Sequence, residues 1–166
     1  MRTLTLPAVS GYDWLLFLHV TAAFLLLSGA VAIAVLQLAA LRGSRPSEIA
    51  FLLGLTRVPE VAIGVGSLGT LGFGIWLAHD VGYGFGEGWI VGALVLWALS
   101  GLLGARGGSR YRRARLEAER LAAGDDRLTP ELAVLLRDRL AFALSWGSGL
   151  AVVAILALMV WKPGAG

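Results

Sequence analysis

The chain has 166 residues, and 57% of them are hydrophobic, compared with about 45–50% in a soluble globular domain. It contains no cysteine, which excludes disulfides, thiolate metal sites and cysteine nucleophiles. All but one of its 14 basic residues are arginines, and they lie mainly in loops that flank apolar runs. That placement is typical of membrane proteins, so the net charge of +3 does not indicate nucleic-acid binding.

Four apolar runs are each long enough to cross a hydrocarbon core about 30 Å thick. They are Trp14–Leu41, Val61–Leu77, Trp89–Leu103 with its flanks, and Leu140–Trp161. We therefore predict an all-α, polytopic membrane protein with a single domain over residues 1–166, built as a four-transmembrane-helix bundle. The predicted spans cover residues 12–41, 57–79, 88–105 and 138–161.

The first span follows a short segment that lacks the layout of a cleavable signal peptide, because it has one arginine and the apolar run is too long. We therefore expect this helix to remain in the mature protein, with Trp14 as its interface anchor. The segment Arg42–Pro46 ends it. Ser47 is the predicted N-cap of a new helix. The segment Ile49–Leu55 in that helix either lies on the surface or extends the second span.

The second span is rich in glycine, at positions 64, 66, 69, 72 and 74. Glycines disfavour a helix in water, but in a bilayer the backbone must hydrogen-bond to itself, so a helix is predicted. Glycines also let neighbouring helices approach at backbone distance. We therefore expect this to be the central helix of the bundle, and we expect a homodimer because its glycines face several sides. The loop Val81–Gly88 is predicted to be a flexible outer turn.

Most of the arginines follow the third span. That span is predicted to end gradually at Gly104–Gly108, with a separate helix over Ser109–Ala123. Thr129 is a predicted N-cap, and Pro130 follows it at the first helical position. We expect the fourth helix to run unbroken from Thr129 to Trp161, a length of about 48 Å. Residues 109–137 would then form a helical hairpin that extends helices 3 and 4 into the cytosol.

Charge and tryptophan positions predict the same topology. The loops after the first and third spans carry arginines, whereas the loop between the second and third spans carries none. The positive-inside rule places both arginine loops in the cytoplasm and both termini outside. Tryptophans at the opposite helix ends predict an outer aromatic belt. They are Trp14, Trp76, Trp89 and Trp161.

His19 is the main candidate for chemistry, because it lies inside the first span, about one and a half turns below Trp14. On a helical wheel it shares a face with small residues and with Gln37. A histidine at this depth needs a partner or a ligand. The nearest candidate partners are the segment Ser67–Gly74 and the third helix around Trp97. His19 is therefore either a polar contact between helices or a ligand for haem, a metal or a proton relay.

Other polar groups extend this candidate site. Trp97 and Trp146 lie deeper than the tryptophan belt, and they either line a pocket with His19 and Ser100 or only pack. At the outer surface, His79 and Asp80 are a weaker candidate cation site, since exposed loop acids are usually just solvated. At the opposite interface, Arg57 and Glu60 are spaced to pair on one helix turn. With residues 137–139 at the same depth, they predict a network of salt bridges that anchors the helices.

Several segments together resemble an uncharacterised bacterial family of predicted four-helix integral membrane proteins. They are Tyr12–Val20, Gly74–His79, Gly86–Trp89 and Met159–Pro163. More distantly, the pattern is similar to copper-resistance-D-type membrane proteins and to the haem-carrying bacterial protoporphyrinogen oxidase. In that oxidase a first-helix histidine is a haem ligand, and His19 matches it. The oxidase also uses a lysine inside the bundle, whereas the one lysine here is Lys162, at the outer end. The resemblance thus implies haem b binding at His19, and the missing lysine removes the basis for expecting the oxidase reaction.

Two functions follow from these observations. The first is a non-enzymatic protein of the bacterial inner membrane that binds or passes a small ligand within its bundle, or supports an unidentified membrane partner. The alternative is a membrane redox protein that binds haem b or a metal through His19. A haem protein is coloured when purified, so a visible spectrum separates the two.

Overall fold

The computed structural model describes residues 10–163, and this part of the chain is helical without any strand. Its helices are α1 (Gly11–Ala40), α2 (Pro46–Gly54), α3 (Arg57–Asp80), α4 (Gly88–Ala122), α5 (Pro130–Leu136) and α6 (Arg139–Trp161). Four helical segments are long and apolar enough to cross a membrane: α1, α2 with α3, α4, and α5 with α6. The predicted all-α, four-span architecture is therefore confirmed.

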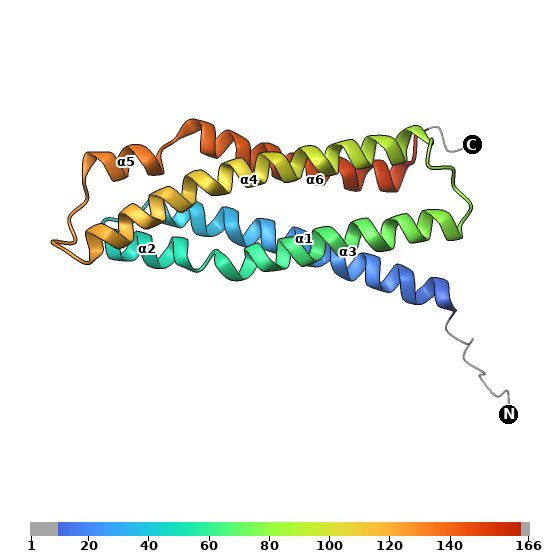
Figure 1. Ribbon diagram of the computed structural model, residues 1–166, viewed down its shortest axis with the longest axis horizontal. Coiled ribbons are helices and arrows are strands. Elements are labelled where there is room, and N and C mark those ends of the chain that lie inside the picture. Colours follow the sequence, from blue (N-terminus) through green and yellow to red (C-terminus); the bar gives the residue numbers. More distant parts are fainter. Residues whose placement is uncertain (1–9, 164–166) are drawn as a thin grey trace, which may run out of the picture.

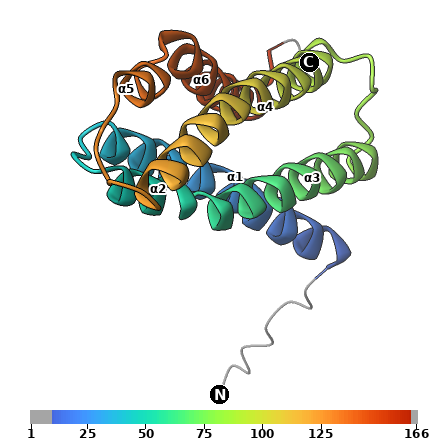
Figure 2. The same ribbon diagram turned by 60° about the vertical axis from the view of Figure 1, so that its left-hand side comes forward.

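The helices form two antiparallel pairs. Helix α1 packs along α3, and α4 packs along α6, whereas contacts between the two pairs are few over most of their length. Figures 1 and 2 show the pairs as two layers joined at their ends. The expectation that the glycine-rich helix is central is therefore wrong, because α3 packs mainly against α1 alone.

Each pair is held at backbone distance by glycine. A Cβ atom on Gly66 of α3 would lie 2.5 Å from the backbone nitrogen of Leu26 and 2.7 Å from the carbonyl oxygen of Ala22 in α1. In the second pair, a Cβ atom on Gly107 of α4 would lie 2.7 Å from Oγ of Ser145 in α6. Small residues thus set the helix spacing within both pairs, as expected for packing in lipid.

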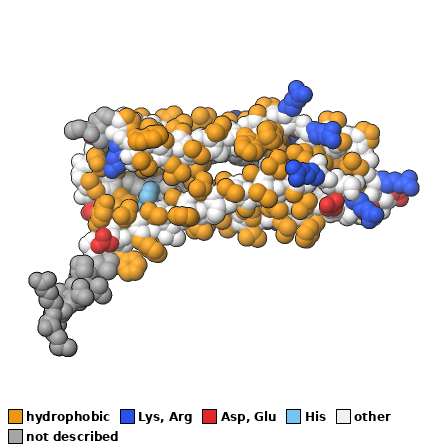
Figure 3. Space-filling view, turned by 180° about the vertical axis from the view of Figure 1, so that it is seen from behind, with side chains coloured by type: hydrophobic (Ala, Val, Ile, Leu, Met, Phe, Trp, Pro, Cys, Tyr) orange, Lys and Arg blue, Asp and Glu red, His pale blue; other side chains and the backbone are white. Residues whose placement is uncertain are grey.

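Charged and aromatic residues mark the two ends of the molecule. One end, which we call the arginine end, holds α2, α5, the C-terminal half of α4 and the arginines from Arg42 to Arg139. The opposite end, which we call the tryptophan end, holds the first turn of α1 and the last turn of α6. Figure 3 shows hydrophobic side chains over the middle of one face and charged side chains towards the ends.

Buried residues that connect the pairs are concentrated at these two ends. At the arginine end, a core joins residues of α1, α2, α4, α5 and α6. Its members are Ala40, Ile49, Leu53, Tyr111, Ala114, Ala118, Leu132, Leu136 and Ala141. At the tryptophan end, a smaller core joins Ala78, Trp89 and Ile90, with Met159 packed against it. Trp89 is therefore buried, unlike the exposed belt residues Trp14, Trp76 and Trp161.

The third helix does not fade at Gly104–Gly108. Instead α4 continues through it for 35 residues, because Gly104 and Gly107 pack against Ser148 and Ser145 of α6. The fourth helix is not unbroken. The helix stops at Arg137, and Asp138 caps a new one by accepting hydrogen bonds from the backbone N–H groups of Leu140 and Ala141. The glycines at 104–108 therefore do not end α4, whereas Asp138 begins a new helix as its N-cap, in a segment that was predicted to be continuous.

Helix α2 extends the second span, as one of the two sequence-based alternatives stated, because only Leu55 and Thr56 interrupt the helical run from Pro46 to Asp80. It buries Ile49 and Leu53 in the arginine-end core, so it does not lie on the surface. Ser47 is not its N-cap, since Arg45 holds that position without a side-chain hydrogen bond. The acceptor comes instead from Asp126, in the loop between α4 and α5. Its two carboxylate oxygens accept from the backbone N–H of Ser47 at 2.8 Å and from the Ser47 hydroxyl at 2.7 Å.

The loop after α3 begins with a defined helix ending. Gly82 has a positive φ of 84°, its N–H bonds to the carbonyl of His79, and the N–H of Tyr83 bonds to the carbonyl of Ala78. This is a Schellman motif, which needs glycine at the left-handed position. Tyr83 then packs edge-on against Trp89 at 5.3 Å between ring centroids. The start of the predicted flexible turn is therefore anchored.

Candidate functional site

His19 lies on α1 with its imidazole against α3. A Cβ atom on Gly74 would lie 2.9 Å from Cε1 and 3.3 Å from Nδ1 of this ring, so glycine makes room for it. The ring also faces the backbone of Thr70, one turn earlier on α3. His19 thus packs on the segment Ser67–Gly74, one of its two predicted neighbours, while the predicted polar partner stays a prediction.

The two ring nitrogens of His19 have different surroundings. Nδ1 is buried and completes no hydrogen bond, although the Thr70 backbone is nearby. Nε2 is not among the buried unpartnered atoms, and the residue as a whole is half-buried. When Nδ1–H faces a backbone carbonyl, the lone pair of a neutral imidazole is on Nε2. In that tautomer Nε2 is the nitrogen that can accept a proton or coordinate a metal.

A second buried group beside His19 also lacks a partner. The Oγ1 atom of Thr70 makes no hydrogen bond within the described residues. Buried polar groups in native structures nearly always have partners, and one without a partner requires an explanation. Thr70 and His19 therefore form a local concentration of unpaired polar atoms at the α1–α3 interface, in an otherwise apolar span.

The remaining candidate residues do not gather around His19. Gln37 is buried near the arginine end of α1, about 27 Å from His19 along the helix. Trp97 donates its indole N–H to Oγ of Ser67 at 2.9 Å, which links the two helix pairs. Ser100 accepts a hydrogen bond at its carbonyl from the Ser148 hydroxyl, at 2.9 Å.

Trp146 and the outer-surface candidates are more exposed. Trp146 stacks at a tilt on Phe142, with 5.4 Å between ring centroids, and nearly half of its surface is exposed. His79 and Asp80 are both exposed at the tryptophan end. Among residues 10–163, no group of three or more histidine, aspartate or glutamate side chains is placed to hold a metal. The outer cation site thus lacks a ready ligand set in the described chain.

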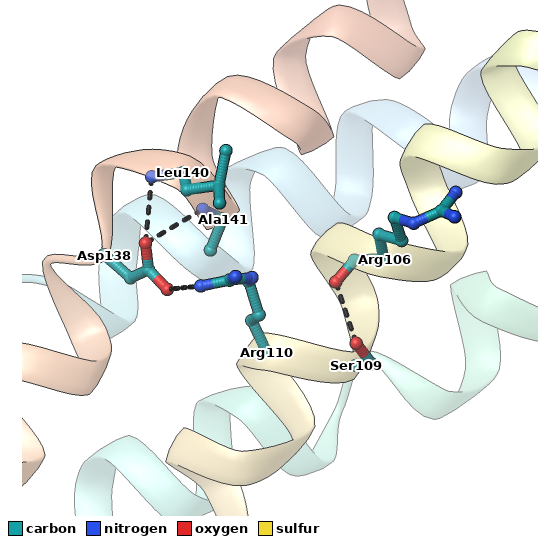
Figure 4. Close-up of polar contacts among 6 residues, drawn as sticks. All are labelled: Arg106, Ser109, Arg110, Asp138, Leu140 and Ala141. Atoms are coloured by element: carbon teal, nitrogen blue, oxygen red, sulfur yellow. Dashed lines mark hydrogen bonds and ion pairs between the residues drawn. The ribbon is translucent and has the colours of Figure 1, made fainter.

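The interfacial charges pair differently from the prediction. Glu60 accepts a hydrogen bond from the Thr56 hydroxyl at 3.0 Å, and Arg57 joins no ion pair within the described chain. Asp138 instead pairs with Arg110 of α4 (Figure 4). Sequence reasoning missed Arg110, because the continuity of α4 brings it opposite the α5–α6 break. The sequence did carry a signal for this pair, because a basic residue in the first arm of the predicted hairpin can meet an acidic residue in the second arm.

A cation–aromatic cluster at the tryptophan end was also missed. The Nζ atom of Lys162 lies 5.0 Å from the ring centroid of Tyr83 and 5.6 Å from that of Trp89. Both distances are within the range of cation–π attraction. Lys162 is therefore held at the tryptophan end by aromatic rings.

Comparison with known protein families places most of this chain in one of them. The model of a family described as "Predicted integral membrane protein (DUF2269)" matches residues 13–163, which is most of the chain. No curated protein matches, and no solved structure does either. The likeness to copper-resistance-D-type and oxidase-type proteins stays a resemblance of sequence patterns.

Proposed function

Since this chain belongs to the DUF2269 family of predicted integral membrane proteins, we propose a function carried out within the bilayer. The protein binds a small membrane-soluble ligand at His19, and the ligand presents a hydrogen-bond donor or a metal to the imidazole. The observation that carries this proposal is the orientation of the ring. Nδ1 lies against Gly74 of α3, and if its N–H faces the Thr70 carbonyl, the lone pair available to a ligand is on Nε2.

The loose association of the two helix pairs supports a ligand in this region. The cores that connect the pairs lie at the two ends, and between them Trp97 and Ser67 make a cross-pair hydrogen bond. Contacts between α3 and α4 and between α1 and α6 are few, so the backbones of the two pairs are not closely packed there. An apolar molecule with one polar group fits such surroundings, because apolar walls with few polar groups are typical of ligand sites.

Haem b is the second candidate ligand, because His19 offers an imidazole within an apolar span. If haem is bound, His19 would supply a nitrogen ligand to its iron, and the haem would supply electron transfer. The apolar side chains of the span would exclude water. Lys162 offers no second ligand, since its amino group lies over the rings of Tyr83 and Trp89.

The test compares His19→Gln with His79→Gln, which changes the exposed histidine near the same end. Glutamine keeps hydrogen-bonding capacity but is a poor ligand for haem or metal. We expect the purified wild type to carry a co-purifying small molecule or a visible haem spectrum. We expect His19→Gln to lose it while keeping its helix content, and His79→Gln to keep it.

Two outcomes would contradict the proposal. A colourless wild type with no co-purifying ligand by mass spectrometry, together with a His19→Gln variant of unchanged stability and cellular activity, would make His19 a structural contact. Equal ligand loss in both histidine variants would show that the ligand is not held by His19.

The orientation that we propose has the arginine end in the cytoplasm of a bacterial inner membrane and both termini outside. The arginines at one end support it through the positive-inside rule. The terminal residues 1–9 and 164–166 lie outside the described structure, while residues 10 and 163 both lie at the tryptophan end. A reporter fused after Gly166 should be active outside the cytoplasm, and cytoplasmic activity would reverse the topology.

We also propose that the protein forms a homodimer through the face of α3 that turns away from α1. A Cβ atom on Gly64 or Gly72 would meet nothing within 4 Å, so these glycines are free for a further helix. Gly69 is unsuitable for the test, because it packs on Ala22 of the same chain. Gly72→Leu should convert dimers to monomers in detergent, as measured by light scattering. A monomeric wild type would refute the dimer.

A further inference from the structure

We propose that the pocket at the α5–α6 break binds the phosphate group of an anionic phospholipid from the membrane. The pocket has a volume of about 230 Å³ and lies at the arginine end. Its lining consists of Leu41, Tyr111, Leu136, Arg137, Asp138, Arg139 and Phe142. This volume is below the ~300–1,000 Å³ of sites for drug-sized ligands, so it suits a headgroup with its chains lying outside.

The break between α5 and α6 creates this pocket. The chain leaves helical geometry at Arg137, and Asp138 begins α6 as its N-cap. Because the two helices are offset there, Arg137 and Arg139 both contribute to the lining from adjacent positions of the chain. An unbroken helix would instead point such neighbours about 160° apart, since i and i+2 do not share a face.

The charges of the pocket favour an anion. Asp138 is the acidic member of the lining, but Arg110 and the N–H groups of Leu140 and Ala141 already engage its carboxylate (Figure 4). Arg137 and Arg139 are exposed and form no ion pair with any residue in the range 10–163. Two arginines thus remain available, and guanidinium groups bind phosphate in bidentate geometry.

The position of Arg139 also indicates a role outside folding. It is the first residue of α6, next to the positive end of the helix dipole, where a cation is unfavourable. Intramolecular stability therefore does not explain an arginine here. An anion bound in the pocket would be attracted both by Arg139 and by the positive end of the helix dipole. The unfavourable placement of Arg139 would then be offset by its attraction to the bound anion.

The apolar lining selects a lipid over a free anion. Leu41, Leu136 and Phe142 form much of the wall, and Phe142 is itself substantially exposed. The pocket lies where α6 begins its apolar span, which is the depth of lipid headgroups in a membrane that holds α1 to α6. A phosphate at the arginines places acyl chains against these apolar side chains.

The test measures lipid binding to the full chain in detergent by native mass spectrometry, with dioleoyl phosphatidylglycerol and dioleoyl phosphatidylcholine as probes. The double variant Arg137→Gln/Arg139→Gln is compared with Arg112→Gln/Arg113→Gln. The control removes the same charge from exposed positions of α4 that do not line the pocket. We expect the pocket variant to lose about tenfold or more of its affinity for phosphatidylglycerol and the control to retain it.

Several results would overturn the proposal. They are equal affinity of the wild type for the two lipids, equal loss in the two double variants, and displacement of phosphatidylglycerol by millimolar inorganic phosphate. The second result would indicate diffuse surface attraction, and the third a site for a free anion. If the double variant does not fold, Arg139→Gln alone answers the question, because removing a cation from a helix start should not destabilise α6.

Discussion

The interface within each helix pair differs sharply from the interface between the pairs. Within the first pair, backbone meets backbone, and a single Cβ atom on Gly66 would overlap the main chain of α1. Between the pairs, the membrane-spanning part has a hydrogen bond from Trp97 to Ser67 and few other contacts. Most of the burial that connects the pairs lies in the two end cores.

Lipid explains why the protein divides in this way. Burying a leucine against another helix gains little when the alternative is a lipid chain that is equally apolar. Close contact therefore forms where small residues allow it, and a helix face lined with glycines packs against one neighbouring helix. Gly66, Gly69 and Gly74 of α3 are used by α1, and Gly64 and Gly72 are left open. The His19 site of the proposed function lies at the glycine-lined interface within the first pair.

The largest effect is expected from breaking the interface within a pair. Gly66→Ala places a methyl group 2.5 Å from the Leu26 nitrogen, so α1 and α3 must separate. Overpacking of this kind costs about 1–3 kcal/mol. Gly101→Ala is the matched control, because it adds the same methyl group to the spanning helix α4 in open space, outside the proposed dimer face, and helix propensity makes it neutral or stabilising by up to ~1 kcal/mol. Thermal unfolding in detergent measures both, and equal stability of the two variants would contradict the packing described here.

A smaller effect is expected from breaking the interface between the pairs. Trp97→Phe removes the indole donor to Ser67 and keeps an aromatic ring, so it should cost about 0.5–1.5 kcal/mol. A double-mutant cycle with Ser67→Ala isolates the hydrogen bond, whose coupling should be near the ~0.6 kcal/mol average for membrane proteins. A coupling above that of typical membrane hydrogen bonds would mean that the pairs associate more tightly than their contacts indicate.

The number and nature of the membrane spans could be predicted from the sequence, because apolar length alone determines a membrane span. The helix ends could not. Gly104–Gly108 stays helical because α6 packs on Gly107, and the break at Asp138 is stabilised by Arg110 of α4. Both depend on residues distant in the sequence. Likewise, composition cannot tell Gly66 from Gly72, although one touches α1 and the other faces open space.

The candidate site could be predicted in part. The helical wheel of α1 placed His19 towards the glycines of α3, and the contact with Gly74 confirms this. It also grouped His19 with Gln37, which shares the face but lies near the opposite end of the helix. Helical periodicity predicts which face of a helix a side chain lies on. A pocket also requires side chains at the same depth and a neighbouring helix at the right distance, and both depend on how the helix pairs pack.

The smallest effect concerns the link between the pairs at the arginine end. Asp126 lies in the loop between α4 and α5, which belongs to the second pair. It accepts two hydrogen bonds from Ser47 at the start of α2, which leads into α3 of the first pair. The Ser47 hydroxyl, and then its backbone N–H, hold the pKa of Asp126 below its ordinary value. A carboxylate with a lowered pKa in the folded state contributes stability above its unfolded-state pKa, which is about 3.9. That contribution is lost as the pH falls through the folded-state pKa.

Asp126→Asn removes this charge and little else, because asparagine keeps one acceptor and also tolerates the left-handed backbone at this position, where φ is 49°. Asp125→Asn is the control, since Asp125 is exposed and lies next to it. At neutral pH we expect Asp126→Asn to unfold at a slightly lower temperature than wild type and to exchange the Ser47 amide hydrogen faster. Below the folded-state pKa the two proteins should converge, because the wild-type carboxyl is then also uncharged. If Asp125→Asn has the same effect, or if the difference persists in acid, the link between the pairs does not depend on the Asp126 charge.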